Sequence, residues 1–211
     1  DVPAILKYTN QVCFIQDMEI ARLTRDGITF YDLDQEEIRK EFTIIEWDQQ
    51  SAEKGGFEHF MLKEIYEQPR AVADTLNPRI QEGEIVIEEL GMSPEEIWQI
   101  DRLQMVACGS AYHVCMSGKY VLERLAGIPV DVDLASEFRY RDPIMTPDTL
   151  VIVVSQSGET ADTLAALRES KKRGHKVLGI VNVVGSSIAR EADSVLYTLA
   201  GPEISVATTK A

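Results

Sequence analysis

Five apolar runs in the second half of the chain constrain its fold more than any other feature. They are short and aliphatic, and they occupy residues 103–108, 130–134, 150–154, 177–181 and 195–199. Continuous apolar runs of this kind are typical of parallel strands buried on both faces of a sheet. Segments with helical spacing separate the runs, and this alternation predicts a doubly wound α/β domain. Ligands of such sheets bind at the carboxyl ends of the strands, near the switch point of the strand order.

Two of the intervening segments carry clear helix signals. Apolar residues recur at helical spacing over 111–125, and Gly127 with Pro129 then supplies a stop signal. Residues 159–173 begin with acidic and end with basic side chains, and Gly174 follows them. Those charges complement the dipole of a helix. Both segments are therefore predicted to be helices that directly follow a strand.

The first part of the chain has a different character. Residues 12–15, 20–23 and 28–31 resemble short strands, and Asp26-Gly27 between two of them is a hairpin signal. We predict a small antiparallel β region over residues 1–47. The polar segment 48–56 ends in Gly-Gly and is typical of an interdomain linker.

The segment that follows this linker has a helical pattern of apolar residues over 57–76. Pro69 lies inside it, and a proline interrupts or kinks a helix. One kinked helix and two short helices are both compatible with the pattern. The second domain then extends from residue 57 to residue 211.

Composition excludes several classes of protein. The formal net charge of −14 argues against a surface that binds nucleic acid, and no apolar run approaches the length of a membrane span. The three cysteines form no Cys-x-x-Cys pair and have no neighbouring His at metal-ligand spacing, so we expect no zinc site and a reducing, cytoplasmic location. The chain opens on Asp1 without a secretory signal, and the missing initiator Met suggests a fragment or a processed chain.

The sequence SQSGET, residues 155–160, is the strongest functional signal. It follows the buried run 150–154 and opens the second predicted helix, so three hydroxyls and a glycine gather at a helix N-terminus. Free amide donors there favour an anion, glycine permits close approach of the backbone, and hydroxyls donate to phosphate oxygens. This pattern predicts a phosphate-binding loop without a lysine. The alternative is that Ser157 and Thr160 only cap the helix.

Two further loops contain polar residues after strands. CGSAYH, residues 108–113, again joins a strand end to a helix start, where Gly109 and Ser110 could contact a sugar or simply form a capped turn. Residues 201–210 gather hydroxyls after the last strand, and they could close over the sugar or form an ordinary polar loop. Neither of these loops nor SQSGET matches a Walker or a GxGxxG motif. We expect Cys108 and Cys115 to be core residues.

Together these segments carry a family resemblance. CGSAYH, SQSGETADTL, NVVGSSIAREAD (182–193) and AGPEISVATTKA (200–211) resemble the first sugar-isomerase (SIS) subdomain of the glutamine:fructose-6-phosphate amidotransferases, or glucosamine-6-phosphate synthases. AEKGGFEHFMLKEIYEQP (52–69) resembles the junction that follows the glutaminase in that family, and residues 1–27 resemble the last part of the glutaminase itself. The resemblance covers nearly the whole chain.

The resemblance implies a flavodoxin-like SIS domain over 57–211, truncated, preceded at 1–47 by the end of an Ntn-type glutaminase domain. It also implies which residues contact fructose 6-phosphate or glucosamine 6-phosphate. Those expected to hold the phosphate are Ser155, Gln156, Ser157 and Thr160, and those expected to contact the sugar are Gly109, Ser110, Val206 and Thr208. Family members commonly have Thr then Ser after the Cys-Gly of the first loop, so this chain lacks a hydroxyl at Ala111.

The family makes glucosamine 6-phosphate from fructose 6-phosphate and glutamine for amino-sugar (UDP-GlcNAc) biosynthesis. Its glutaminase nucleophile and its isomerase acid, base and lysine would lie outside this chain, so we expect no catalytic residue here. The resemblance implies a homodimer through the isomerase domains, no cofactor and no metal. Three alternatives remain open: a simple phosphosugar isomerase, a sugar-phosphate sensor that regulates a partner without catalysis, and a structural dimerisation module that binds no phosphosugar.

Overall fold

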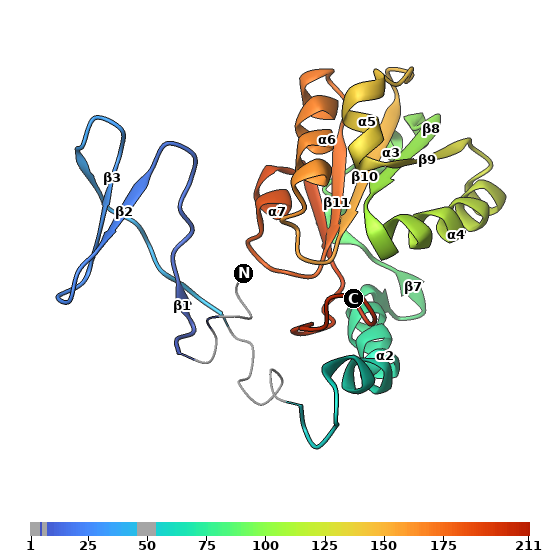
Figure 1. Cartoon of the computed structure of the whole chain (residues 1–211). Coiled ribbons are helices and arrows are strands. Elements are labelled where there is room, and N and C mark those ends of the chain that lie inside the picture. Colours follow the sequence, from blue (N-terminus) through green and yellow to red (C-terminus); the bar gives the residue numbers. More distant parts are fainter. Residues whose placement is uncertain (1–4, 6–7, 46–53) are drawn as a thin grey trace. The chain divides into compact units, whose positions relative to one another are not determined.

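The computed structural model describes residues 5, 8–45 and 54–211 (Figure 1). Contacts within the chain divide it into two compact units, residues 1–53 and 54–211. The predicted linker 48–56 falls largely outside the described residues, so the domain boundaries and the nature of the first domain stay predictions.

The described part of the first unit contains five short strands. β2 and β3 form the hairpin predicted from Asp26-Gly27, and Thr24 N donates to Gly27 O across 2.9 Å in its turn. β4 extends this sheet beyond β3, while β1 pairs with β5. The prediction of a strand over 12–15 was wrong beyond residue 12, because β1 has only the short β5 as a partner. The bounds are β1 Gln11–Val12, β2 Ile20–Leu23, β3 Ile28–Tyr31, β4 Glu37–Ile38 and β5 Thr43–Ile44.

The first helix of the second unit is α2 (Phe60–Leu76). It continues through Pro69, so the segment forms one helix and not two short ones. Pro69 cannot donate to the carbonyl of Ile65, and both residues are exposed, so water can satisfy that carbonyl. Short elements lead from α2 to the sheet. They are η2 (Asn77–Arg79), β6 (Ile80–Gln81), β7 (Glu84–Ile85), η3 (Glu88–Leu90) and α3 (Pro94–Gln99).

A five-stranded parallel sheet forms the core of this unit, in the order β12-β11-β10-β8-β9. All five predicted strands are present, and the predicted fold class is confirmed. Because β9 follows β8 on one side and β10 follows on the other, the strand order switches between β8 and β10. The bounds are β8 Arg102–Ala107, β9 Val130–Leu134, β10 Thr149–Ser155, β11 Val177–Val181 and β12 Ser194–Tyr197.

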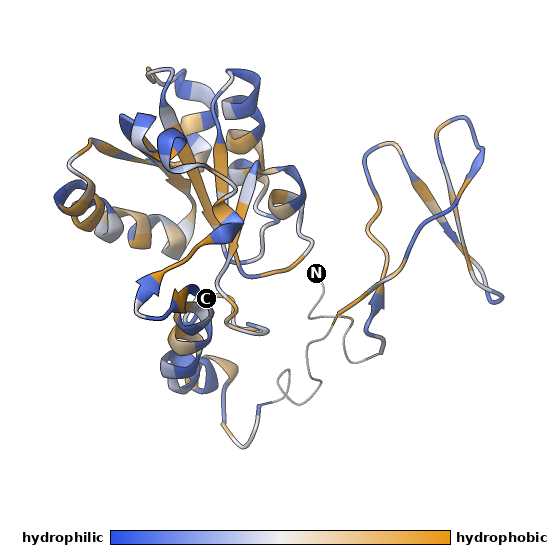
Figure 2. Cartoon of the chain, turned by 180° about the vertical axis from the view of Figure 1, so that it is seen from behind, coloured by the Kyte–Doolittle hydropathy of each residue, from blue (hydrophilic) through white to orange (hydrophobic). Residues whose placement is uncertain are grey.

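Helices cover both faces of the sheet, whose strands are strongly hydrophobic (Figure 2). One face packs against α5, α6 and α7, around a core that includes Phe138, Leu167 and Ile188. The other face packs against α4, where Cys115 is fully buried. The predicted end of this helix is confirmed, because Gly127 is the C-cap of α4 and has the left-handed conformation. The bounds are α4 Gly109–Ala126, α5 Ala135–Arg141, α6 Ala161–Lys172 and α7 Ser187–Glu191.

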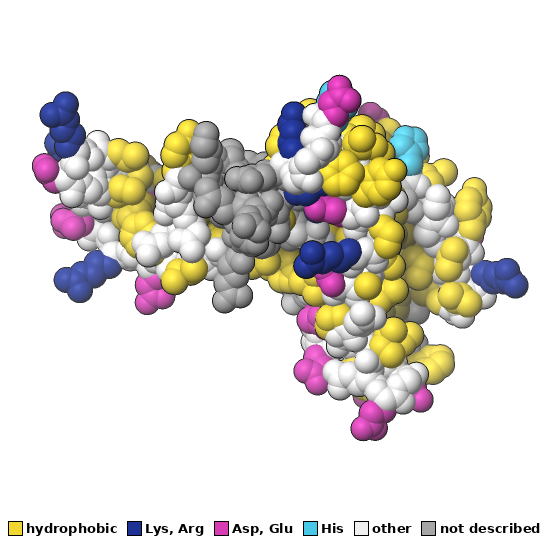
Figure 3. All heavy atoms as spheres, turned by 90° about the horizontal axis from the view of Figure 1, so that it is seen from below, with side chains coloured by type: hydrophobic (Ala, Val, Ile, Leu, Met, Phe, Trp, Pro, Cys, Tyr) yellow, Lys and Arg dark blue, Asp and Glu magenta, His cyan; other side chains and the backbone are white. Residues whose placement is uncertain are grey.

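Hydrophobic side chains also reach the surface of the molecule in several places (Figure 3). Helices α2 and α4 each carry a row of exposed apolar side chains. Both helices pack against the rest of the unit through a different face. The exposed residues are Met61, Leu62, Ile65, Tyr66, Val72 and Leu76 on α2, and Val114, Tyr120, Val121 and Leu125 on α4.

Candidate functional site

The loop after β10 is a compact turn built by its own hydroxyls. Ser155 ends the strand and is buried, and its Oγ accepts a hydrogen bond from Gly158 N at 3.1 Å. The same Oγ lies 3.0 Å from Thr160 Oγ1. Ser157 Oγ accepts from Glu159 N at 3.2 Å. The structure thus brings the hydroxyls predicted to hold a phosphate into one loop.

Thr160 is the N-cap residue of α6, but its side chain makes no capping hydrogen bond. Its hydroxyl pairs with Ser155 instead, so Thr160 does not cap the helix through its side chain, whereas Ser157 does accept a backbone amide of the loop. The first bond that follows the helical pattern runs from Leu164 N to Thr160 O, at 2.9 Å. The amides of residues 161–163 therefore have no partner within the helix, and such donors favour an anion.

Gly158 is required at the centre of the loop for two reasons. Its φ is +65°, a conformation that other residues adopt only with strain. A Cβ at this position would also lie 2.0 Å from Ser186 Oγ and 2.5 Å from Ser186 Cβ. The glycine therefore lets the loop lie directly against the segment that follows β11.

The segment that follows β11 holds the loop by backbone hydrogen bonds. Asn182 N and Val183 N both donate to Gln156 O, at 3.1 and 3.3 Å. Ile188 N, in the first turn of α7, donates to Gly158 O at 3.0 Å. Sequence reasoning assigned no role to these residues. The available signal was the Gly-Ser-Ser sequence at 185–187, which follows a buried strand.

The loop after β8 follows the strand that pairs with β10. β8 and β10 pair in parallel with Ala107 opposite Val154, so their two loops leave the same edge of the sheet at the switch point. Thr163 Oγ1 of α6 donates to Cys108 Sγ across 3.9 Å, which joins the first turn of α6 to the loop after β8. Gly109 and Ser110 are exposed at this edge and open α4. They are accessible to a ligand, and they form no hydrogen-bonded turn like that of residues 155–160.

The C-terminal segment reaches the site through Asn182. The Asn182 side chain donates to Gly201 O at 2.7 Å and accepts from Ala200 N at 3.0 Å. Val206 is fully exposed and Thr208 is half-buried. Among the described residues, no hydrogen bond joins Val206 or Thr208 to residues 155–160. The structure therefore places the predicted sugar-contacting segment beside the loop after β11, and its contact with a sugar stays a prediction.

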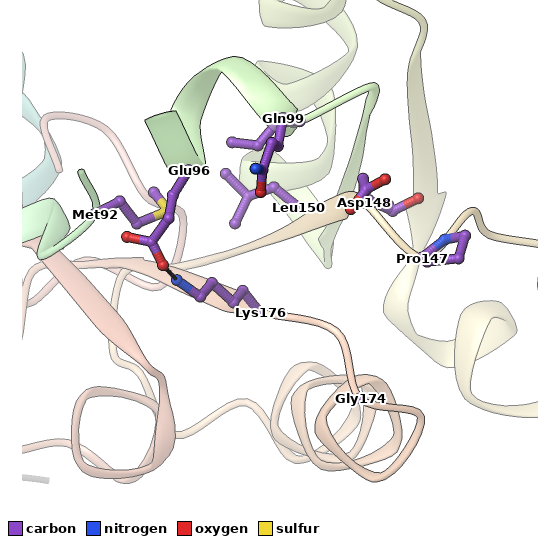
Figure 4. A pocket seen from close by; sticks show the side chains of 10 residues that line it. Met92, Glu96, Gln99, Pro147, Asp148, Leu150, Gly174 and Lys176 are labelled. Carbon is purple, nitrogen blue, oxygen red and sulfur yellow. Dashed lines mark hydrogen bonds and ion pairs between the residues drawn. The ribbon is translucent and has the colours of Figure 1, made fainter. Parts of the chain in front are cut away.

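A separate cavity of about 180 Å³ lies at the amino ends of the strands, between α3 and the starts of β10 and β11 (Figure 4). Met92, Gln99 and Leu150 line it, and an ion pair between Glu96 and Lys176 closes one side. Its lining contains none of the predicted site residues. We therefore place the candidate site at the carboxyl edge, where amide donors and hydroxyls converge.

Cys115 is an inert core residue, as the sequence predicted. Burial raises the pKa of its thiol to about 11, which keeps it protonated at neutral pH. Within the described part of the chain, no group of three or more His, Cys, Asp or Glu side chains could hold a metal ion. No described helix is long and apolar enough to cross a membrane.

Comparison with known proteins identifies the domain. The model of the SIS domain family matches residues 96–211, more than half of the chain. The chain belongs to the SIS domain family. The SIS match begins in α3 and includes the whole parallel sheet, whereas α2 and the first unit precede it.

Relatives of this SIS chain extend the match to the residues that precede the family domain. A glutamine–fructose-6-phosphate aminotransferase [isomerizing] from Clostridium acetobutylicum is 59% identical over all of this chain, which spans 35% of that relative. The one from Caldanaerobacter subterraneus subsp. tengcongensis is 55% identical over the same share. The chain therefore spans about a third of the length of these curated relatives.

Solved structures agree with the SIS assignment. The C-terminal domain of glucosamine-fructose-6-phosphate aminotransferase from Francisella tularensis is 45% identical, with a TM-score of 0.69 over 75% of this chain and 44% of that one. The sugar isomerase domain of an RpiR transcription factor from Sphaerobacter thermophilus is 26% identical, with a TM-score of 0.52 over 64% of this chain and 73% of that one.

Proposed function

We propose that this chain is the part of a glutamine–fructose-6-phosphate aminotransferase that binds fructose 6-phosphate and glucosamine 6-phosphate. The observation that carries the proposal is the loop 155–160 at the switch point, where hydroxyls and free helix amides meet. A phosphate there would accept hydrogen bonds from Ser155, Ser157 and Thr160. It would also face the positive end of the α6 dipole.

Each remaining site residue has a role in this proposal. Gln156 contributes to the phosphate loop, while Gly109 and Ser110 contact the sugar from the neighbouring strand. Val206 and Thr208 contact the sugar from the C-terminal segment. The phosphate is fixed at one end so that binding energy orients the reacting carbonyl of the sugar toward catalytic groups outside this chain.

The proposal extends to the whole protein. We infer that it forms glucosamine 6-phosphate from fructose 6-phosphate and glutamine in the cytoplasm, as a homodimer that contacts through its isomerase domains. Residues 1–47 belong to its glutaminase domain, and residues 57–211 form the first of its SIS subdomains. The chain by itself binds the sugar phosphate without turning it over, because none of its site residues is in a catalytic role.

Calorimetric titration tests the binding proposal. Fructose 6-phosphate and glucosamine 6-phosphate are each titrated into the wild type and into a variant with Ser155→Ala and Thr160→Val. We expect saturable binding by the wild type and at least a roughly tenfold loss in the variant, because two hydroxyl donors to a dianion are removed. Ser117→Ala removes an exposed hydroxyl of α4 and serves as the matched control, with unchanged affinity. Equal affinities in all three proteins would contradict the proposed phosphate loop.

A sugar-phosphate sensor without catalysis is the second candidate, and the likeness to a sugar isomerase domain of a transcription factor favours it. That likeness covers 64% of this chain, whereas the curated aminotransferases align with all of it, including α2 and the first unit. An assay of the full-length protein separates the two. Glucosamine 6-phosphate formed from fructose 6-phosphate and glutamine supports the enzyme, and binding without turnover supports the sensor.

A further inference from the structure

Helix α2 packs by a polar face. Lys63 and Glu64 are 8% and 2% exposed, whereas the apolar side chains of Met61, Ile65 and Tyr66 are exposed. A helix that buries a carboxylate in place of an available apolar face loses hydration of the charge, so the buried acid must have compensating partners. Those partners lie in the C-terminal segment, far along the chain and close in space (Figure 1).

Glu64 holds a turn of that segment by three hydrogen bonds. Its Oε1 accepts from Ile204 N at 2.8 Å and from Ser205 N at 3.1 Å. Its Oε2 accepts from the hydroxyl of Ser205. One carboxylate thus accepts hydrogen bonds from two consecutive backbone amides and from the hydroxyl of Ser205. Hydrogen bonds to a charged acceptor are stronger than neutral ones.

A second buried acid holds the far side of the same segment. Glu203 is 6% exposed, and its Oε1 accepts from Thr209 N at 2.7 Å and from Lys210 N at 2.9 Å. Contacts from α2 reinforce this end, because Lys210 Nζ donates to Glu67 Oε2 at 2.6 Å. Residues 205–208 therefore form a loop whose two ends are fixed by carboxylates.

The loop between these anchors contains Val206 and Thr208, which the proposed function assigns to the sugar. We propose that Glu64 is a positioning residue for sugar binding: from α2, it fixes the turn at Ile204 and Ser205 and so presents Val206 and Thr208 to the substrate. This inference rests on the proposed function and deepens it. It assigns part of the substrate site to a helix that lies outside the residues matched by the SIS family.

The proposal makes a prediction that a purely structural role does not. Within the described residues, the hydrogen bonds of the Glu64 side chain go to Ile204 and Ser205 of the C-terminal segment. Residues 155–160 are held by backbone hydrogen bonds from Asn182, Val183 and Ile188 instead. Loss of the Glu64 carboxylate should therefore weaken the binding of a sugar phosphate and leave the binding of inorganic phosphate unchanged. General destabilisation would weaken the binding of both ligands together.

The experiment compares Glu64→Gln with Asp74→Asn in the full chain. Both changes convert a carboxylate of α2 to an amide, but Asp74 is exposed and forms an ion pair with Arg70 of its own helix. We expect Glu64→Gln to weaken fructose 6-phosphate binding by about tenfold, because the variant loses a charged acceptor for two amides and a hydroxyl. Inorganic phosphate should bind equally well to both variants and to the wild type. Ser205→Ala, which removes only the hydroxyl, should weaken the sugar phosphate by a smaller factor.

Amide hydrogen exchange in the absence of ligand separates this inference from the proposed function. In the wild type and in Asp74→Asn, the amides of Ile204 and Ser205 should exchange slowly, and in Glu64→Gln they should exchange faster. Three results would each overturn the positioning role. They are unchanged amide protection in Glu64→Gln, the same affinity of Glu64→Gln and wild type for the sugar phosphate, and an equal loss of affinity for inorganic phosphate. A wild type that protects these amides yet binds no sugar phosphate would contradict the proposed function, and with it the role of the anchored loop in binding.

Discussion

Gly158 is a position where the proposed phosphate loop, residues 155–160, tolerates little change. A Gly158→Ala variant would adopt a left-handed conformation, at a cost of about 1–2 kcal/mol, and would place its Cβ against Ser186, at a further cost of about 1–3 kcal/mol. We expect a loss of stability equal to this sum in chemical denaturation, together with a loss of sugar phosphate binding.

Gly174 provides a matched control for this prediction. Its φ is +87°, and apart from its two chain neighbours no described residue has a heavy atom within 4 Å of the point that a Cβ would occupy. Gly174→Ala should therefore lose only the conformational part of the stability and keep its affinity. A second change, Ser186→Gly, should recover part of the stability lost in Gly158→Ala. Equal effects of the two alanine variants would show that the contact with Ser186 is unimportant.

The residues of the site differed in how well sequence reasoning could place them. Ser155, Ser157 and Thr160 were predictable, because hydroxyls and glycine directly follow a buried strand and precede a helix. Asn182 and Glu64 were not, since each acts through contacts with residues distant in the sequence. Nothing in the local pattern of α2 marks Glu64, which stands beside Lys63 in what looks like an ordinary polar face.

At the scale of elements, an ion pair joins α6, which opens at the phosphate loop, to α7, which supports that loop. Arg168 donates to both carboxylate oxygens of Glu191, at 2.8 and 2.7 Å, and these bonds lower the pKa of Glu191 from its ordinary value of 4.5. A carboxylate with a lowered pKa stabilises the folded state fully above its ordinary pKa. This contribution is lost as the pH falls through the lowered pKa.

We therefore expect Glu191→Gln to be less stable than the wild type at pH 7, by under about 1 kcal/mol because the pair is partly exposed. The difference should shrink as the pH falls from 4.5 through the lowered pKa of Glu191, where the wild-type carboxyl becomes protonated in the folded state as well. Urea denaturation of both proteins across this range measures it. A difference that persists unchanged at the lowest pH would contradict the assigned ion pair.

The order of the elements was also predictable in part. Strands of the parallel sheet are continuous apolar runs, and the structure confirms all of them. The short strands of the first unit were less predictable, since β1 pairs with β5 across more than thirty residues of sequence rather than with its neighbour. The continuity of α2 through Pro69 depends on exposure at Ile65 and Pro69, which a local pattern does not contain.

For the whole molecule, the rows of exposed apolar side chains on α2 and α4 carry a prediction. Val114, Val121 and Leu125 share one face of α4 and are 65%, 56% and 79% exposed. Exposed apolar patches of this kind bind hydrophobic dyes. We expect the folded chain to enhance the fluorescence of such a dye, and Val121→Ser with Leu125→Gln to reduce it without loss of stability. A folded wild type that leaves the dye unaffected would contradict this view of the surface.

The most direct test of the account is a nuclear magnetic resonance titration of the chain with fructose 6-phosphate, followed through its backbone amides. The phosphate loop and the cavity beside α3 lie at opposite edges of the sheet, so the two locations give distinct patterns. We predict saturable shifts that are largest at residues 156–163 and present at Gly109 and Ser110. Shifts that cluster instead around Met92, Leu150 and Lys176, or that never saturate, would contradict it.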